Sequence, residues 1–318
     1  MRVFALLLLL LPCFAFSQKQ WKQDTLLMGS PFTFVVYNDD EALSKKAIAE
    51  GIAEVVRIEN EISDWLPHTP VSKINAMAGH QAVKVSQEVF ELFKRAIRYS
   101  QISDGIFDIT YAGMERIWKF DGSMNELPTQ EQLNKALKTV GYQHIQLDET
   151  QKSVFLQLSK SKVSFGSIGK AYAAQRAAEK MKSKGVEHIL VNAAGDLYVF
   201  GNPPGKDCWR IGLQNPFRRS KTLQSVCVKD EAILTSGDYE KFVFIDGKRY
   251  GHIINPKTGM PSTQNVSVTV KGKNAELANF LSTTLMLLDK KQAKALAKQY
   301  PEYKIWLVQS DGKTRRYN

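Results

Sequence analysis

Apolar patterns typical of helices and of strands are mixed along this chain, and their order is the strongest constraint on its fold. Apolar residues recur at helical spacing over residues 40–62 and after Ser86, which predicts two long helices. A capping box of Thr129 and Gln132 predicts a third helix that ends at Gly141. Strand-like segments lie around these helices, at residues 25–37, 144–149, 153–158, 162–165 and 187–192. Because strands and helices do not alternate strictly, the sequence predicts an α+β fold with mixed or antiparallel sheets and packed helices.

The first 17 residues have the features of a secretory signal peptide. They combine one positive charge at Arg2, a short leucine run and the small-x-small cleavage signal Ala15-Phe16-Ser17. The apolar run is shorter than the roughly 20 residues that a membrane-spanning helix needs. We therefore expect cleavage near Ser17 and a soluble periplasmic or otherwise extracytoplasmic protein. Cys13 offers a lipoprotein alternative, but Pro12 stands where a small residue normally precedes the lipidated cysteine.

Residues 18–318 are expected to form a single domain. No Ser/Pro/Gly-rich linker, charge block or internal repeat divides them. This segment keeps two cysteines, Cys208 and Cys227, and both lie in strand-like contexts. An oxidising compartment would permit them to pair, but the sequence does not establish that they do.

The chain is basic, with a formal net charge of +11 that becomes +10 once Arg2 is removed. A basic protein attracts anions, and nucleic acid is one candidate. The sequence shows no zinc-finger spacing, recognition-helix pattern or aromatic-rich RNA signature, so we expect no nucleic-acid partner. An anionic small substrate or an anionic membrane surface fits an exported protein better, and solubility alone is the alternative explanation of the charge.

Polar and turn-forming residues are concentrated between residues 234 and 261. A strand-like segment ends at Asp246-Gly247, a pair that suits a tight hairpin turn, and the chain returns to His252. Prolines and glycine then fix a short loop around Lys257 and Thr258. This arrangement predicts a site that gathers Ser236, Asp238 and His252, although an ordinary hairpin with a polar loop would give a similar pattern.

A glycine loop at residues 166–170 leads directly into a predicted helix and ends in Lys170. Backbone N–H groups at a helix N-terminus and a nearby cation are suited to phosphate oxygens. The loop is not a Walker A motif, because its glycines are too close together and Ala171 stands where a magnesium-binding hydroxyl would be needed. Phosphate binding and a simple turn both remain open for this segment alone.

Three further groups of polar residues lie at the ends of predicted elements, at residues 61–65, 104–110 and 192–196. The first includes Trp65, whose ring could stack on a flat ligand, and the second contains two carboxylates and a hydroxyl. Helix capping is a sufficient explanation of either of these two groups taken alone. The third follows a strand, where ligands of mixed sheets often bind.

Signatures of zinc enzymes and of serine hydrolases are weak in this sequence. The five histidines show no HExxH or paired spacing, and no GxSxG elbow occurs. Ser167 and Lys170 match an SxxK pattern, and residues 257–259 read KTG, as in penicillin-binding proteins and β-lactamases. No SDN-like triplet lies between them, and prolines flank the KTG where that class needs a regular strand. We keep an acylating serine enzyme only as a remote alternative.

Taken in order, these segments resemble the ApbE family of FAD:protein FMN transferases across nearly the whole mature chain. Six ordered matches carry the resemblance, at Met28-Gly29 and at residues 59–75, 104–110, 166–170, 192–196 and 234–261. The resemblance implies a single ApbE-like domain that takes FAD, splits its diphosphate with Mg²⁺ and joins FMN through a phosphoester to a Thr or Ser of an exported acceptor protein, releasing AMP.

The resemblance also implies roles for particular residues. The residues expected to be catalytic are His252, Lys170 and Asp238. Those expected to bind the flavin nucleotide are Met28, Trp65, Ile106, Phe107, Asp108, Ser164, Lys170, His252 and Ile253. Those expected to bind the metal are Ser167, Asn279, Ser282 and Thr283.

Two positions depart from the family pattern. Ser164 replaces the aspartate that usually opens the glycine loop, and Asn279 replaces the aspartate of the late A-D-x-x-x-T metal motif. An amide oxygen can coordinate a hard cation but supplies no charge. The alternative function is therefore an exported FAD-binding protein that has kept the cleft and lost turnover.

Overall fold

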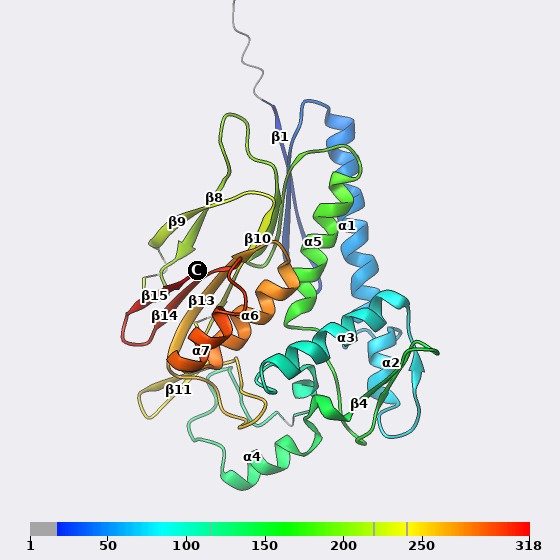
Figure 1. Cartoon of the computed structure of the whole chain (residues 1–318), viewed down its shortest axis with the longest axis vertical. Helices are drawn as coiled ribbons and strands as arrows, with labels where there is room; N and C mark the ends of the chain where they lie inside the picture. Colours follow the sequence, from blue (N-terminus) through cyan, green and yellow to red (C-terminus); the bar gives the residue numbers. More distant parts are fainter. Residues whose placement is uncertain (1–17, 115, 219, 240) are drawn as a thin grey trace, which may run out of the picture.

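The computed structural model describes residues 18–114, 116–218, 220–239 and 241–318 (Figure 1). The predicted signal peptide and Cys13 lie outside the described residues. Among the described residues, no helix combines the length and apolar character needed to cross a bilayer.

The largest sheet has eight strands, and each pair of neighbours in it is antiparallel. Across the sheet these strands are β1 Gln20–Leu27, β2 Ser30–Tyr37, β6 His188–Ala193, β7 Asp196–Phe200, β10 Glu231–Gly237, β13 Asn265–Gly272, β14 Lys304–Gln309 and β15 Thr314–Tyr317. Smaller sheets are formed by β3 Val83–Lys84, β5 Ser153–Leu156 and β4 Ile145–Asp148, by β8 Trp209–Gln214 and β9 Thr222–Val228, and by β11 Phe242–Ile245 and β12 Lys248–Gly251. The predicted α+β class is confirmed.

The α-helices of the described chain are α1 Glu41–Ile62, α2 Pro70–Ala76, α3 Gln87–Ile102, α4 Gln130–Ala136, α5 Ile168–Lys182, α6 Ala275–Leu287 and α7 Lys290–Ala297. Short 3₁₀ turns are η1 Ile109–Gly113, η2 Leu137–Thr139 and η3 Tyr142–His144. The long helices begin where the sequence predicts, because Asp40 caps α1 and Ser86 caps α3 through hydrogen bonds to backbone N–H groups. The capping box of Thr129 is present, but the α-helix is shorter than predicted because its end tightens into η2.

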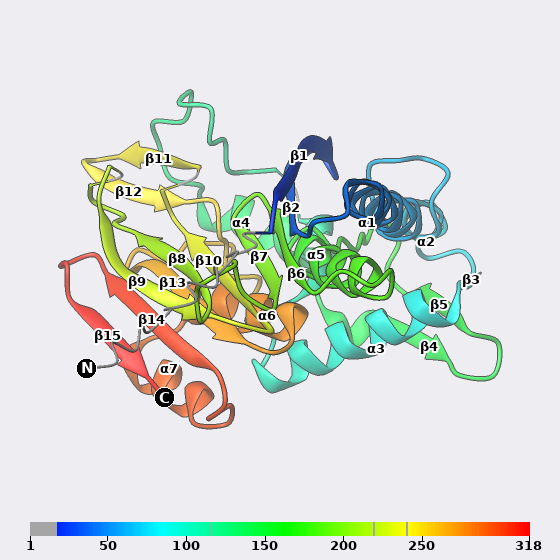
Figure 2. The same cartoon turned by 90° about the horizontal axis from the view of Figure 1, so that it is seen from above.

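The main sheet is covered on both faces, as the two views show (Figures 1 and 2). Alternate residues of β2 point to opposite faces: Phe32, Phe34 and Val36 join the main core with α1, α5 and α6, whereas Val35 joins a second core. In that second core, Trp209 and Val226 of the β8–β9 hairpin pack on the sheet. The hairpin therefore covers the face opposite the helices.

Residues 162–165 are not a strand, contrary to the prediction. Val163 and Phe165 are buried, but the polar backbone groups of Val163 pair with the side chain of Asn75. Asn75 Oδ1 accepts from Val163 N at 2.8 Å, and Asn75 Nδ2 donates to Val163 O at 2.9 Å. The amide side chain of Asn75 thus pairs with Val163 as a neighbouring strand would, and the backbone N–H of Ser164 donates to the carbonyl of Ile109 at 3.0 Å.

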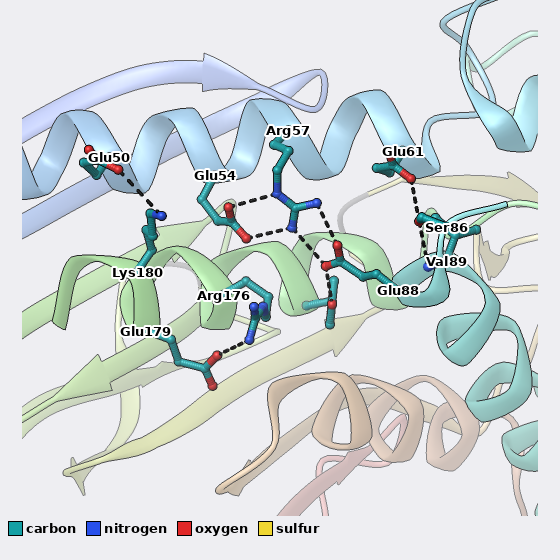
Figure 3. Close-up of polar contacts among 11 residues, drawn as sticks. Glu50, Glu54, Arg57, Glu61, Ser86, Glu88, Val89, Arg176, Glu179 and Lys180 are labelled. Carbon is teal, nitrogen blue, oxygen red and sulfur yellow. Dashed lines mark hydrogen bonds and ion pairs between the residues drawn. The ribbon is translucent and has the colours of Figure 1, made fainter. Parts of the chain in front are cut away.

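A network of charged side chains joins α1, α3 and α5 on the surface (Figure 3). Arg57 of α1 contacts Glu54 of its own helix and Glu88 of α3, at 2.8 and 2.7 Å. Glu88 also accepts a hydrogen bond of 2.6 Å from the hydroxyl of Tyr172 in α5. A network of this kind holds long side chains better than an isolated surface pair does, and it fixes α5 against the other two helices.

Cys208 and Cys227 form a disulfide in the structure, which answers the question that the sequence left open. The bond lies at the open end of the β8–β9 hairpin and joins residues separated by 19 positions. We expect the double substitution Cys208→Ser and Cys227→Ser to lower the free energy of unfolding by about 3 kcal/mol, because the unfolded chain loses a loop of roughly 20 residues. Urea denaturation monitored by tryptophan fluorescence measures this effect, and coincident curves for parent and variant would contradict it.

Candidate functional site

A cavity of about 640 Å³ lies where the N-terminal end of α5, the β6–β7 turn, β10 and the β8–β9 hairpin meet. Its walls come from segments that are far apart in the sequence, at residues 106–111, 164–170, 194–197, 211–214, 233–239, 241 and 252–256, with Asn279 and Thr283 of α6. Four of the polar segments singled out in the sequence thus share one cavity. Its size is typical of a site for a small molecule or cofactor.

The first turn of α5 forms the part of the wall that suits a phosphate. Gly169 allows close packing of α5 on α1, because a Cβ there would lie 2.9 Å from Ile62 Cδ1 of α1. Lys170 lines the cavity, and the one hydrogen bond that its Nζ makes to a described residue is a weak contact of 3.5 Å to the carbonyl of Gly166. Ser164 Oγ donates to Asp64 at 3.1 Å and accepts from Gly166 N. Ser164 therefore holds the glycine loop that follows it in the chain.

Hydroxyl and amide oxygens converge between α5 and α6. Ser167 Oγ lies 2.9 Å from Asn279 Oδ1 and 3.3 Å from Thr283 Oγ1. Ser236 of β10 approaches the same group, since its Oγ lies 2.9 Å from Ser282 Oγ and 3.5 Å from Thr283 Oγ1. The structure thus brings together all four predicted metal-binding residues.

Asp196 adds a buried carboxylate to this oxygen cluster. The side chain lies at the start of β7, lines the cavity and accepts a hydrogen bond of 3.3 Å from Asn279 Nδ2. Burial raises the pKa of Asp196 to about 7, although the charge of Lys170 opposes the rise. Across the described residues, no group of three or more His, Cys, Asp or Glu side chains is placed to hold a metal ion. Any cation here would therefore rest mainly on neutral oxygens and this one carboxylate.

Asp108 organises the wall formed by residues 106–111. Its Oδ1 accepts from both the backbone N–H and the hydroxyl of Thr110, at 2.8 and 2.6 Å, and its Oδ2 accepts from Tyr142 N at 2.7 Å. Burial raises the pKa of Asp108, and these hydrogen bonds partly oppose the rise. Ile106 and Phe107 line the cavity beside Asp108, and their contacts with a flavin stay predictions.

His252 lines the cavity at the end of the β11–β12 hairpin, together with Ile253. The turn of this hairpin is the predicted one, with positive φ at both Asp246 and Gly247. His252 Nδ1 lies 3.2 Å from the carbonyl of Lys241, so one ring nitrogen is held by the backbone and the ring is oriented.

Comparisons with known proteins identify the family of this chain. The model of the ApbE family matches residues 28–307. The chain belongs to the ApbE family. It is 30% identical to a FAD:protein FMN transferase of Klebsiella pneumoniae strain 342, over 89% of this chain and 87% of that protein. The resemblance inferred from the sequence is confirmed.

Solved structures of ApbE proteins share the fold. The ApbE protein of Thermotoga maritima superimposes with a TM-score of 0.83 at 29% identity, over 94% of this chain and 97% of that chain. The apo form of the flavinyl transferase ApbE of Pseudomonas stutzeri also gives 0.83, at 26% identity over 95% and 96% of the two chains. The shared ApbE fold argues against the alternative of an acylating serine enzyme. The KTG residues 257–259 also lie in a turn, whereas that enzyme class needs them on a strand.

Four residues to which the resemblance assigns a role lie outside the lining of the cavity: Asp238, Trp65, Met28 and the buried Ser282. Asp238 is turned toward Arg249, with Oδ1 2.9 Å from Nη2, and its contacts fix the hairpin. Trp65 is 76% exposed and lies under the guanidinium of Arg116 at 5.4 Å from the ring centre. Met28 sits at positive φ in the β1–β2 turn and packs on the main core. The catalytic role of Asp238 and the ligand contacts of Trp65 and Met28 stay predictions.

Sequence reasoning did not assign a role to Asp196, Ser236 or the β8 wall at residues 211–214. Asp196 and Ser236 line the cavity and lie in segments that are polar in the sequence. The signal that could have assigned them to the site was this polar character together with their position after or within a strand. β8 carries no such signal, because its contribution to the ApbE cavity depends on how the hairpin packs on the sheet.

Proposed function

We propose that this chain is a flavin transferase that cleaves FAD, attaches FMN through a phosphoester to a Thr or Ser of an acceptor protein, and releases AMP in a magnesium-dependent reaction. One observation carries the proposal: a single cavity places the N-terminal end of α5 and Lys170 beside the oxygen cluster of Ser167, Asn279 and Thr283. The printed names of its relatives, FAD:protein FMN transferase and flavinyl transferase, support it.

Different residues of the cavity have different roles in such a reaction. The first turn of α5 and Lys170 are suited to the diphosphate of FAD, because both present positive charge to its oxygens. The acceptor hydroxyl oxygen would form a bond to the phosphorus of the FMN half. The bond from that phosphorus to the bridging oxygen would break, and AMP would leave with that oxygen. Positioning and charge neutralisation account for most of the catalysis in transfers of this kind.

His252 is the candidate for the proton of the incoming hydroxyl. Its Nδ1 is held against the carbonyl of Lys241, and the side chain lines the cavity. An imidazole oriented in this way can receive the hydroxyl proton at its other nitrogen as the new phosphoester forms. Asp238 contributes indirectly, by holding Arg249 and with it the hairpin that leads to His252.

The oxygen cluster fits a small hard cation. Ser167 Oγ, Asn279 Oδ1 and Thr283 Oγ1 lie 2.9 to 3.4 Å from one another, and the carboxylate of Asp196 is within 3.3 Å of Asn279. Oxygen is the ligand that Mg²⁺ prefers, and Mg²⁺ bound here would neutralise phosphate charge. Ser282 Oγ donates to the carbonyl of Asn279 at 3.0 Å. Ser282 does not line the cavity, so its side chain supports Asn279 and does not face a bound cation.

Export to the periplasm is a further part of the proposal and rests on the sequence of residues 1–17. The acceptor would accordingly be an exported protein. Intact-mass measurement of the protein recovered from the producing cells decides between a chain that starts near Gln18, one that retains Met1 and one that carries lipid on Cys13.

The test of the proposed function combines purified protein, FAD and MgCl₂ with a candidate acceptor domain. We expect AMP in the supernatant and a fluorescent flavin band on the acceptor after denaturing electrophoresis. Binding of FAD without AMP and without a labelled band would instead support the FAD-binding protein that lacks turnover. No binding and no AMP would overturn both functions.

We expect Asn279→Asp to lower the magnesium concentration needed for half-maximal AMP release by about tenfold. The substitution restores one negative charge to the oxygen cluster, and hard cations bind carboxylates more tightly than amides. FAD binding in EDTA should change little or weaken slightly, because the added charge would face the diphosphate without a cation. Gln299→Glu, a change of the same kind outside the cavity, is the control, and superimposable titrations for Asn279→Asp and the parent would remove Asn279 from the metal site.

A further inference from the structure

The two hairpins that flank the cavity each carry an exposed aromatic ring just beyond the lining residues. Residues 211–214 of β8 line the cavity, and Phe217 in the turn that follows is 50% exposed. Lys241 lines the cavity on the other hairpin, and Phe244 of β11 is 60% exposed. Three residues of extended chain span about 10 Å, so both rings lie near the cavity. Both hairpins lie on the side of the molecule away from α1 and α2 (Figures 1 and 2).

The same hairpins carry exposed cations that have no acidic partner among the residues that the structure describes. Arg218 and Lys221 lie in and beside the β8–β9 turn, and Lys248 begins β12. None of the three forms an ion pair with a residue that the structure describes, whereas Arg249 is paired with Asp238. We call Phe217, Arg218, Lys221, Phe244 and Lys248 the rim.

We propose that the rim binds an extended acidic segment of the acceptor protein, the segment that presents the Ser or Thr to the cavity. The inference rests on the proposed transfer function and concerns how its macromolecular substrate is recognised. The hydroxyl of a short side chain must reach atoms inside the cavity, so the backbone that carries it has to cross the surface beside the opening. Exposed aromatic rings supply the apolar contact typical of protein interfaces, and cations that form no ion pair with a described residue favour a partner of opposite charge.

Charge complementarity favours an acidic protein segment as the occupant. The whole chain has a net charge of +11, and the described β8–β9 turn contains no acidic residue between Asn215 and Thr222. On the other hairpin, Asp246 at the turn is an opposing charge beside Lys248. Aromatic and arginine side chains together are also the residue types enriched at binding hot spots.

The experiment uses the full mature chain with FAD, MgCl₂ and a pool of 13-residue peptides that have a central Thr and randomised flanks. Flavinylated products are sequenced by mass spectrometry. We expect the parent to select peptides with Asp and Glu near the Thr. Phe217→Ser with Phe244→Ser should reduce the yield about tenfold, which corresponds to about 1.4 kcal/mol of binding, and Lys221→Glu with Lys248→Glu should abolish the acidic preference.

Matched substitutions on α1, Val56→Ser with Lys46→Glu, control for general effects of polar and charge changes, because Val56 and Lys46 are exposed and do not line the cavity. FAD binding, measured by flavin fluorescence, should stay within twofold for all variants. A pool of products with no acidic preference, or rim variants that transfer like the α1 control, would overturn the proposal. AMP release without any labelled peptide would also count against it, whereas no AMP from the parent would refute the proposed function itself.

An anionic membrane is the competing occupant, and a second measurement separates it. The same variants are sedimented with phosphatidylglycerol vesicles. We expect little binding by the parent. Strong vesicle binding that the rim variants lose, with peptide selection unchanged, would assign the rim to a lipid surface and overturn the proposal.

Discussion

Lys170→Ala is expected to reduce kcat/KM for AMP release from FAD by about a hundredfold or more and to weaken FAD binding about tenfold. The reason is the loss of a cation beside the N-terminal end of α5, where developing phosphate charge must be neutralised. Folding should be little affected, because the only hydrogen bond of Nζ to a residue that the structure describes is the weak 3.5 Å contact to the carbonyl of Gly166. Steady-state kinetics and flavin fluorescence titration measure the two effects, and thermal unfolding checks the fold.

Lys180→Ala is the matched control, since Lys180 lies on the same helix and reaches Glu50 at 3.8 Å on the surface. His252→Ala distinguishes the two proposed roles, because it should slow transfer to an acceptor without a comparable loss of FAD affinity. Parental rates in both Lys170→Ala and His252→Ala would show that the site is assigned wrongly.

Asp196→Asn is expected to stabilise the metal-free protein above neutral pH. The pKa of Asp196 in the folded protein is raised to about 7 from an ordinary value of 3.8. Between these values the unfolded chain has lost the proton and the folded chain keeps it, so the free energy of unfolding falls as the pH rises. Because each pKa unit is worth 1.36 kcal/mol, the parent should lose roughly 4 kcal/mol between pH 4 and pH 8 from this group.

The amide that Asp196→Asn introduces resembles the neutral acid and does not titrate. The free energy of unfolding of the variant should therefore not fall in this way as the pH rises. Urea denaturation in EDTA at several pH values measures the difference between the proteins, which should be small at pH 4 and largest at pH 8. Asp39→Asn, at an exposed aspartate, serves as the control. A constant difference between parent and Asp196→Asn across this range would show that the buried carboxylate is not the cause.

Local sequence determined the elements that depend only on residues close to one another in the chain. Asp40 and Ser86 begin α1 and α3 because their side chains accept from N–H groups three residues away, and no distant partner is needed. The Asp246-Gly247 turn follows in the same way from residues that tolerate positive φ. The ordered polar segments also sufficed to indicate the family and most of the cavity wall, because motif spacing is a property of the chain itself.

Tertiary structure alone decided which distant groups meet. Residues 162–165 read as a strand, but the distant Asn75 satisfies the backbone of Val163 instead, and nothing near Val163 in the sequence signals that partner. The sequence placed Asp238 in a site motif, and packing turned it toward Arg249. The pairing of Cys208 with Cys227, the burial that raises the pKa of Asp196 and the β8 wall depend on contacts between elements. Side-chain periodicity records which face of an element is buried, but it does not record what covers that face.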